Sequence, residues 1–235
     1  MTLKNRTVFA LAAVAGGLFA ASAANAEVLV SMTYDDLRGA YTASSPTDGQ
    51  FTAHAVSQLN PRIRSSGDVS RLVPGFGTAF FDPGFVSGPD LGAFTTAISV
   101  VGIVGNSATG TGSFTSTDAD GDTITGLISG TWIGISPTPG TTFLTFAGVL
   151  SGVSLNDNGP LDGTFDGSGG GSFGLNLPGN PPYDGAVVVL SFGNTGFFNS
   201  NFDNRATSFA GQIVPAPGAL ALVGLGGLVA IRRRR

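Results

Sequence analysis

The sequence predicts an all-β fold, either an antiparallel β-sandwich or a barrel-like domain. Its 235 residues include 37 Gly and 13 Pro, and both residue types destabilise the interior of a helix. Runs rich in Phe and in β-branched residues recur along the chain, separated by turn-forming residues at intervals of about 8–15 residues. No segment of the body has the spacing of apolar residues that an amphipathic helix requires.

Between two end segments, nine runs have the composition and alternation of strands. They cover residues 27–34, 50–56, 93–104, 113–117, 122–135, 141–153, 172–177, 186–192 and 206–213. Residues 74–89 contain three Pro and several Gly, which predicts an irregular loop. Residues 156–171 are polar and rich in Gly, which predicts a flexible connection. The remaining Gly residues of the body are assigned to turns between strands.

The first 26 residues have the three regions of a secretory signal peptide. Lys4 and Arg6 make the start positive, an apolar run follows, and Ala24 and Ala26 provide a cleavage site of the small-x-small type. The apolar run is short for a bilayer span. We therefore expect a signal helix that signal peptidase removes, rather than a permanent anchor. Cleavage leaves Glu27 as the first residue of a body that folds outside the cytoplasm.

Residues 214–235 form a second segment of a different kind. It has three parts, which are a proline motif, an unbroken apolar run from residue 218 to 231, and a basic cluster. The motif consists of Val214, Pro215, Ala216 and Pro217, and the cluster consists of Arg232, Arg233, Arg234 and Arg235. As a helix, the apolar run is about 21 Å long, against about 30 Å for the hydrocarbon core of a bilayer.

The arginines behind this apolar run follow the positive-inside rule. We therefore expect a C-terminal hydrophobic helix that holds the exported body at the outer face of the inner membrane. The alternative is a C-terminal helix buried in the core, which four consecutive arginines disfavour.

The order of proline motif, apolar helix and arginine cluster resembles the PEP-CTERM sorting signal of Gram-negative bacteria. The resemblance covers the tail alone, residues 214–235. The family motif is Pro-Glu-Pro, and Ala216 stands where the family has the acidic residue, which is similar to a Val-Pro-Ala-Pro variant of the motif. The resemblance implies recognition by an exosortase, an integral-membrane transpeptidase-like enzyme, and removal of the tail. It also implies a destination at the cell surface or in the exopolysaccharide matrix.

The body, residues 27–213, is long enough for one sizeable β domain and is acidic. All 15 acidic residues lie between Glu27 and Asp203, whereas six of the 11 basic residues lie in the two end segments, so the net charge of the body is near −10. This charge argues against nucleic acid as a partner. The chain has no Cys and one His, His54, which excludes disulfides and leaves too few ligands for a Cys/His zinc site.

The acidic run Asp118, Asp120 and Asp122 is the most suggestive candidate for a metal site. Three carboxylates at alternate positions supply the hard oxygen ligands that Ca²⁺ takes. The run lacks the Gly and the acidic residue that a helix-flanked calcium loop has at its sixth and twelfth positions. The pair Asp120-Gly121 suits a two-residue hairpin turn, and we expect the turn, with weak calcium binding on top of it as the alternative. For residues 156–171 we expect a flexible connection. The alternatives are that this segment supplies a second cation site or a sugar-contacting loop.

The sequence contains no pattern that is diagnostic of catalysis. Asp35 and Asp36 are adjacent, and neighbours on a strand point to opposite faces, so we do not expect them to share a glycosidase reaction. A glycosidase needs two carboxylates about 5–10 Å apart in a cleft, which other acidic residues could provide in space. His54 lies in an alternating run and is expected to be a surface or half-buried strand residue rather than a general base.

Four aromatic side chains, those of Trp132, Tyr34, Tyr41 and Tyr183, are candidates for stacking on sugars, although a place in the core is the simpler expectation for Trp132. Together these features predict an exported protein with a structural or adhesive role and no catalytic activity, with exopolysaccharide as a partner. The alternatives are a secreted polysaccharide hydrolase or lyase that uses paired carboxylates, and a calcium-dependent carbohydrate-binding module. We expect no cofactor other than weakly bound calcium.

Overall fold

A computed structural model of the chain describes residues 28–57, 63–72, 77–82, 94–158, 161–179, 181–183 and 186–214. Regular structure in these residues is entirely β, as predicted. The strands are β1 (Val30–Ala43), β2 (Gly49–His54), β3 (Ser66–Arg71), β4 (Gly77–Phe81), β5 (Phe94–Val104), β6 (Ser107–Thr117), β7 (Thr123–Thr138), β8 (Thr141–Asn156), β9 (Thr164–Asp166), β10 (Ser172–Gly174), β11 (Ala186–Asn194) and β12 (Phe202–Ile213).

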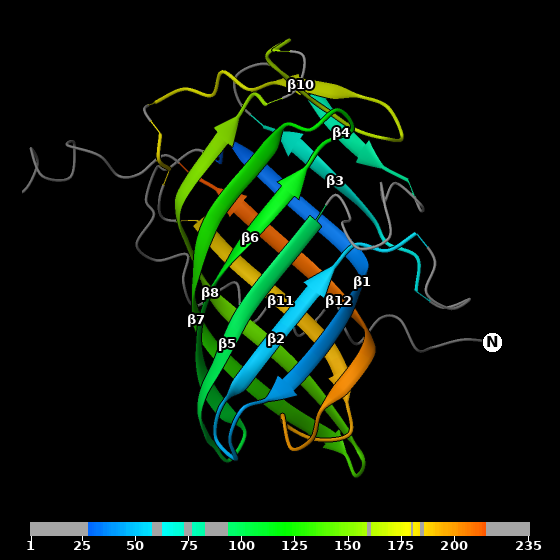
Figure 1. Cartoon of the computed structure of the whole chain (residues 1–235), viewed down its shortest axis with the longest axis vertical. Coiled ribbons are helices and arrows are strands. Elements are labelled where there is room, and N and C mark those ends of the chain that lie inside the picture. Colours follow the sequence, from blue (N-terminus) through cyan, green and yellow to red (C-terminus); the bar gives the residue numbers. More distant parts are fainter. Residues whose placement is uncertain are drawn as a thin grey trace, which may run out of the picture.

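Eight of these strands close into an antiparallel barrel (Figure 1). They follow one another in the order β1-β2-β5-β6-β7-β8-β11-β12, and β12 pairs again with β1, from Val30 opposite Ile213 to Tyr41 opposite Phe202. Of the two predicted architectures, the barrel is therefore the one that forms. Closure pairs the outermost strands with each other, so these eight strands leave no open sheet edge along the barrel.

A bulge in β1 allows this strand to change its partner. Residues 30–35 pair with β3, and residues 38–43 pair with β2. Between them Asp36 has a φ of 53°, and the side chains of Asp35 and Asp36 are both exposed. The prediction that these two carboxylates point to opposite faces is therefore wrong, because a bulge interrupts the alternation of a strand.

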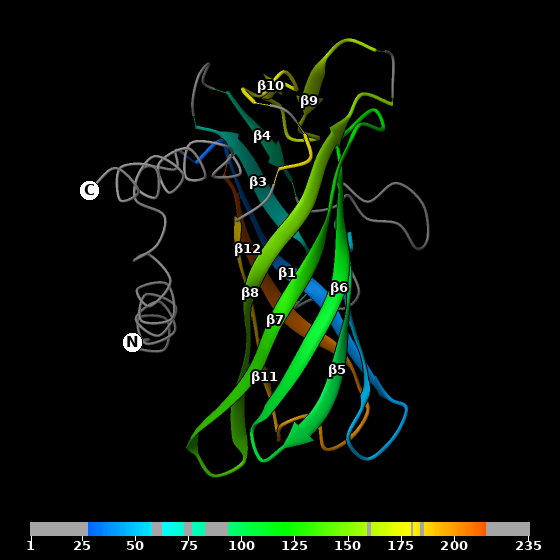
Figure 2. The same ribbon diagram turned by 90° about the vertical axis from the view of Figure 1, so that its left-hand side faces the viewer.

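Two hairpins lie over one end of the barrel, which we call the capped end (Figure 2). The β3–β4 hairpin extends the sheet from β1, and β9–β10 lies beside β4 through a bridge between Phe80 and Gly170. The ring of Phe81 joins the cap to the barrel, because its centroid lies 5.8 Å from that of Tyr34 and 6.2 Å from that of Phe165. The apolar core therefore continues from the barrel into the cap.

Three strands of this cap were not predicted. β4 lies within residues 74–89, where the sequence predicts a loop, and β9 lies within residues 156–171, where it predicts a flexible connection. Both predictions are wrong for these strands, and β3 has no counterpart among the predicted runs. The three strands have three to six residues each, and partners distant in the sequence determine their pairing, so local alternation gives little signal.

Aromatic side chains fill the barrel. Trp132 on β7 is fully buried, and its ring centroid lies 4.9 Å from that of Phe146 and 5.1 Å from those of Phe51 and Phe198. Its Nε1 donates a hydrogen bond of 3.1 Å to the carbonyl oxygen of Ser99. An eight-stranded barrel is just wide enough for side chains to fill it, and the predicted core position of Trp132 is confirmed.

The three tyrosines also belong to the core. Tyr34 and Tyr41 are each 1% exposed and Tyr183 is 5% exposed, so their proposed role in stacking on sugars is wrong. The hydroxyl of Tyr34 forms a hydrogen bond of 2.5 Å with the hydroxyl of Ser116. Burial raises the pKa of Tyr34 well above its ordinary value, which keeps this phenol neutral inside the barrel.

Several glycines lie within strands. On β7, Gly126, Gly130 and Gly134 alternate with the larger residues Ile128 and Trp132 on the inward side. A Cβ atom at Gly126 would lie 2.7 Å from Cε1 of Phe114 and 2.9 Å from Cγ2 of Val153. These glycines therefore make room for the rings that fill the barrel.

This packing predicts the effect of Gly126→Ala. We expect the free energy of unfolding to fall by about 1–3 kcal/mol, because the added methyl group overpacks the interior. Gly193→Ala is the matched control, since Gly193 is an exposed residue of β11 and a Cβ there meets no atom within 4 Å. Urea denaturation of both variants measures the difference. Equal stability of Gly126→Ala and Gly193→Ala would contradict this account of the glycines.

The two expected terminal helices lie outside the described residues. The residues of the predicted cleavage site and most of the predicted sorting motif also lie outside the described residues. They are Ala24, Ala26, Glu27, Pro215, Ala216, Pro217 and Arg232 to Arg235. Val214, which directly follows β12, is described. In the part of the chain that the structure describes, there is no helix with the length and apolar character needed to cross a membrane.

Candidate functional site

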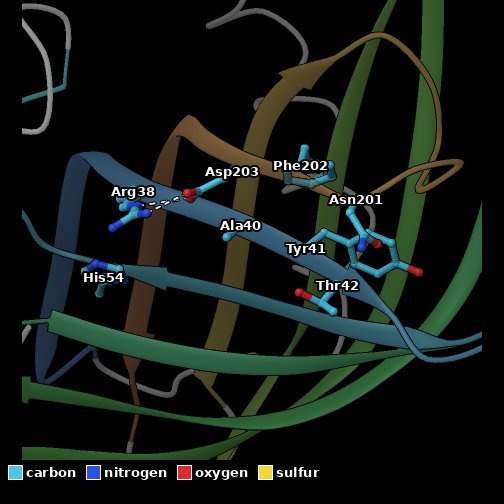
Figure 3. A pocket seen from close by; sticks show the side chains of 8 residues that line it. All are labelled: Arg38, Ala40, Tyr41, Thr42, His54, Asn201, Phe202 and Asp203. Carbon is cyan, nitrogen blue, oxygen red and sulfur yellow. Dashed lines mark hydrogen bonds and ion pairs between the residues drawn. The ribbon is translucent and has the colours of Figure 1, made fainter.

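An open groove crosses β1, β2 and the start of β12 on the outside of the barrel (Figure 3). Its lining residues are Arg38, Ala40, Tyr41, Thr42, His54, Asn201, Phe202 and Asp203. In the groove Arg38 and Asp203 form a bidentate ion pair, with distances of 3.0 Å from Nε to Oδ1 and 2.6 Å from Nη2 to Oδ2. His54 is half-buried on β2, as predicted.

The charges of this groove do not form an acid–base pair. Hydrogen bonds from Arg38 hold the pKa of Asp203 below its usual range, so this carboxylate is ionised at neutral pH. Asp203 is the one carboxylate among the described lining residues. The groove therefore lacks the second carboxylate that glycoside hydrolysis needs.

The acidic run that the sequence analysis singled out lies at the capped end, in the turn between β6 and β7. Oδ1 of Asp118 accepts hydrogen bonds from the backbone N–H groups of Asp120, Gly121 and Asp122 at 3.1, 2.8 and 2.8 Å. Its Oδ2 accepts a further bond of 2.8 Å from the N–H of Asp166. A turn joins the two strands as expected, but it covers residues 118–122 rather than the predicted two residues. Of the pair Asp120-Gly121, Gly121 alone has a positive φ. The carboxylate of Asp118 is the group that organises this longer turn.

Residues after β8 bring three more aspartates to this turn. In each of two groups, carboxylate oxygens from three residues lie within 4.8 Å of one another. The first group is Asp118, Asp120 and Asp166, and the second group is Asp122, Asp157 and Asp162. The three predicted calcium ligands are therefore divided between two groups, and each group is completed by residues that follow β8.

The two groups differ in what already satisfies their carboxylates. In the first group both oxygens of Asp118 accept backbone hydrogen bonds, which gives this residue a structural role. In the second group Asp122 is fully buried, and its Oδ1 accepts a bond of 2.6 Å from the N–H of Asn158. Oδ1 of Asp157 is also buried and accepts no hydrogen bond.

Neighbouring carboxylates at the capped end raise the proton affinity of Asp120. The pKa of Asp120 rises to about 6, first because of a side-chain hydrogen bond with Asp118, and further through the charges of Asp118, Asp122 and Asp162. Lys is absent from residues 28–214. The ion pair of Arg38 with Asp203 lies elsewhere. The six aspartates thus form a concentrated negative site.

A third surface is free of charge. Strands β5, β6, β7, β8 and β11 contain no Asp, Glu, Lys, Arg or His, and we call their outer face the uncharged wall. Apolar side chains that are at least one third exposed project from it, namely those of Val101, Val104, Leu127, Ile133, Ile135, Phe143 and Val149. Interface cores have the same depletion of charged residues.

Comparison with known proteins finds no relative of this chain. No protein-family model matches the chain, and neither a curated protein nor a solved structure matches it.

Proposed function

We propose that this chain is an exported protein of the cell surface or exopolysaccharide matrix, with a structural or adhesive role and no catalytic activity. In this proposal, signal peptidase removes residues 1–26, and an exosortase recognises and removes the tail, residues 214–235. The inner membrane holds the body between these two steps. The barrel then acts through its outer surface, in contact with the matrix polysaccharide or with neighbouring proteins.

The observation that carries this proposal is the combination of two sorting segments with a barrel whose inside is packed. Many small exported barrels hold a ligand in an interior cavity. Here Trp132, Phe51 and Phe146 occupy that space, so binding is left to the outside. The uncharged wall supports an adhesive role, because exposed apolar and hydroxyl side chains lie side by side on it without charges to desolvate.

The composition of the body supports export in a second way. A closed barrel with a continuous aromatic core needs no disulfide, which suits a chain without Cys outside the cytoplasm. The net charge near −10 keeps such a body soluble while an apolar tail is still attached to it.

The tail can be tested by replacing Pro215, Pro217 and the four arginines from 232 to 235 with Ala, in a host that contains an exosortase. We expect the unaltered chain in the surface and medium fractions without its tail. The altered chain should stay in the membrane fraction with its tail intact, because the exosortase no longer recognises the tail while the apolar run from residue 218 to 231 is unaltered. Immunoblots of the cell fractions with an antibody against the body measure this.

Arg64→Ala is the matched control, since it removes an exposed arginine of the body and leaves the tail unaltered. It should be sorted like the unaltered chain. Equal sorting of the tail variant and the unaltered chain would contradict the proposed role of the tail.

A further inference from the structure

We propose that the uncharged wall is the contact surface between two copies of this chain. The wall is the outer face of β5, β6, β7, β8 and β11, and the first four of these strands lie side by side in Figure 2. The eight barrel strands have no open edge, so a contact between two barrels is made by side chains rather than by pairing of strands. The inference rests on the proposed structural role, because it names the neighbouring protein, and it does not depend on the route of export.

The absence of charge is the first observation that points to a second copy. The five strands contain no charged residue, and neither do the turns 105–106 and 139–140 that join two pairs of them. The body as a whole has a net charge near −10, from 15 acidic and five basic residues, and two bodies with the same large charge repel each other. On the wall, two copies can approach without desolvating a charge or placing like charges in contact. Self-association is therefore favoured at this face.

The second observation is that apolar side chains of neighbouring strands gather on the wall. On β7 and β8, Leu127 and Val149 are diagonal neighbours, and Ile135 is paired directly with Phe143. These four side chains are 36–59% exposed. Burial of apolar surface favours association, and the same wall of a second copy offers apolar surface of the same kind. The hydroxyl groups of Ser and Thr between these side chains can form hydrogen bonds across the contact.

The size of the wall fits a dimer. Its central strands, β6, β7 and β8, contain 11 to 16 residues. With strands about 4.8 Å apart and about 3.3 Å per residue, three strands over 11 residues cover about 14 Å by 36 Å, or about 500 Å². Two copies together then bury about 1,000 Å², which is near the lower limit for a specific protein–protein contact. We therefore expect a weak dimer, with a dissociation constant on the order of 10 μM.

The capped end determines the orientation of the two copies. A contact between identical faces has a twofold axis, which lies either along the strands or across them. An axis along the strands brings the aspartates of both β6–β7 turns to the same end, where they repel one another. An axis across the strands places the two capped ends at opposite ends of the dimer. We expect this second arrangement, in which Ser129, near the middle of β7, lies close to the axis.

The first test is sedimentation equilibrium of the full chain at about 1 μM and about 100 μM, where the expected affinity gives mostly monomer and mostly dimer. Salt screens the repulsion between the acidic bodies, so dimerisation should strengthen from about 0.05 to about 0.5 M NaCl. Leu127→Lys places an unpaired charge in the contact and should raise the dissociation constant at least tenfold. The matched control is Leu161→Lys, because Leu161 is 74% exposed and lies outside the wall. It should dimerise like the unaltered chain, and both variants have the same end segments, so their difference reports the wall alone.

Single cysteines provide a second measurement, since the chain has no cysteine of its own. Ser129 is exposed on the wall, and Ala210 is exposed on β12, outside the wall. A bis-maleimide that spans about 10 Å, the spacing of two packed sheets, should join two copies of Ser129→Cys but not two copies of Ala210→Cys.

Three results would each overturn the proposal. They are a chain that stays monomeric at both concentrations, which would leave the wall to polysaccharide or solvent, equal association of Leu127→Lys and Leu161→Lys, and equal cross-linking of the two cysteine variants. Sorting of the tail variant is measured separately in cell fractions, so failure of the dimer leaves the proposed export unaffected.

Discussion

Trp132→Ala is expected to lower the free energy of unfolding by about 3–5 kcal/mol, which is the usual range for removal of a large aromatic side chain from a core. The indole contacts three other rings at centroid distances of 4.9–5.1 Å, and Trp132 is 0% exposed. Truncation also leaves the carbonyl oxygen of Ser99 without the Nε1 donor. Strands on both sides of the barrel lose contacts, so the interior cannot readily collapse around the cavity.

Chemical denaturation followed by circular dichroism measures this change. Leu127→Ala is the control on the same strand, because Leu127 points outward and is 59% exposed. It should change the stability by no more than about 0.5 kcal/mol. If Trp132→Ala and Leu127→Ala were equally stable, the barrel could not be packed around Trp132 as described.

The second large effect is expected at the β6–β7 turn, where Asp118→Ala should cost about 3 kcal/mol of stability. Each hydrogen bond to a charged acceptor contributes about 1.5–3 kcal/mol, and Asp118 accepts four from backbone groups. The sum is smaller than four separate bonds, because water reaches some of the freed N–H groups. The fourth bond, from Asp166, also fastens β9 to the turn.

Two variants separate this role from a general effect of negative charge. Asp118→Asn keeps a side-chain oxygen as an acceptor and should lose less stability than Asp118→Ala. Asp120→Asn should cause no loss, because Asp120 is exposed and lies among carboxylates that raise its pKa to about 6. Thermal melts of the three variants in EGTA provide the comparison. A loss in Asp120→Asn as large as that in Asp118→Ala would contradict the turn-forming role of Asp118.

The barrel strands could be predicted because each alternates over many residues. β7, for example, has a buried residue at every second position from Ile124 to Gly134 except Gly130, which is partly exposed. Period-two alternation is the signal of a half-buried strand. The choice between a sandwich and a barrel could not be predicted. It depends on the pairing of β12 with β1, which joins residues about 170 positions apart in the sequence, and no local pattern records such a pairing.

The glycines show a second limit of the sequence. Gly126 and Gly130 lie inward, in a strand of 16 residues. Their role becomes apparent once Phe114 and Phe146 are seen to occupy the space beside them. Local propensity disfavours Gly in strands, and packing across the barrel overrides that propensity here.

The candidate cation site could be predicted in part. The run from Asp118 to Asp122 indicated the location, and the Gly-rich segment after β8 was noted as a second source of carboxylates. The sequence could not show that Asp122 separates from Asp118 and joins Asp157 and Asp162, because that division depends on how the segment folds back onto the turn. Burial of Asp122 is likewise a property of the folded chain.

The central claim is that this barrel is an exported body processed at both ends, and the mass of the protein recovered from the cell surface tests it most directly. Intact mass spectrometry should find a chain that begins at Glu27 and lacks the arginines from 232 to 235. A surface protein that still contains Met1 or Ile231 would contradict the account. Recovery of the whole 235-residue chain from the cytoplasm would contradict it as well.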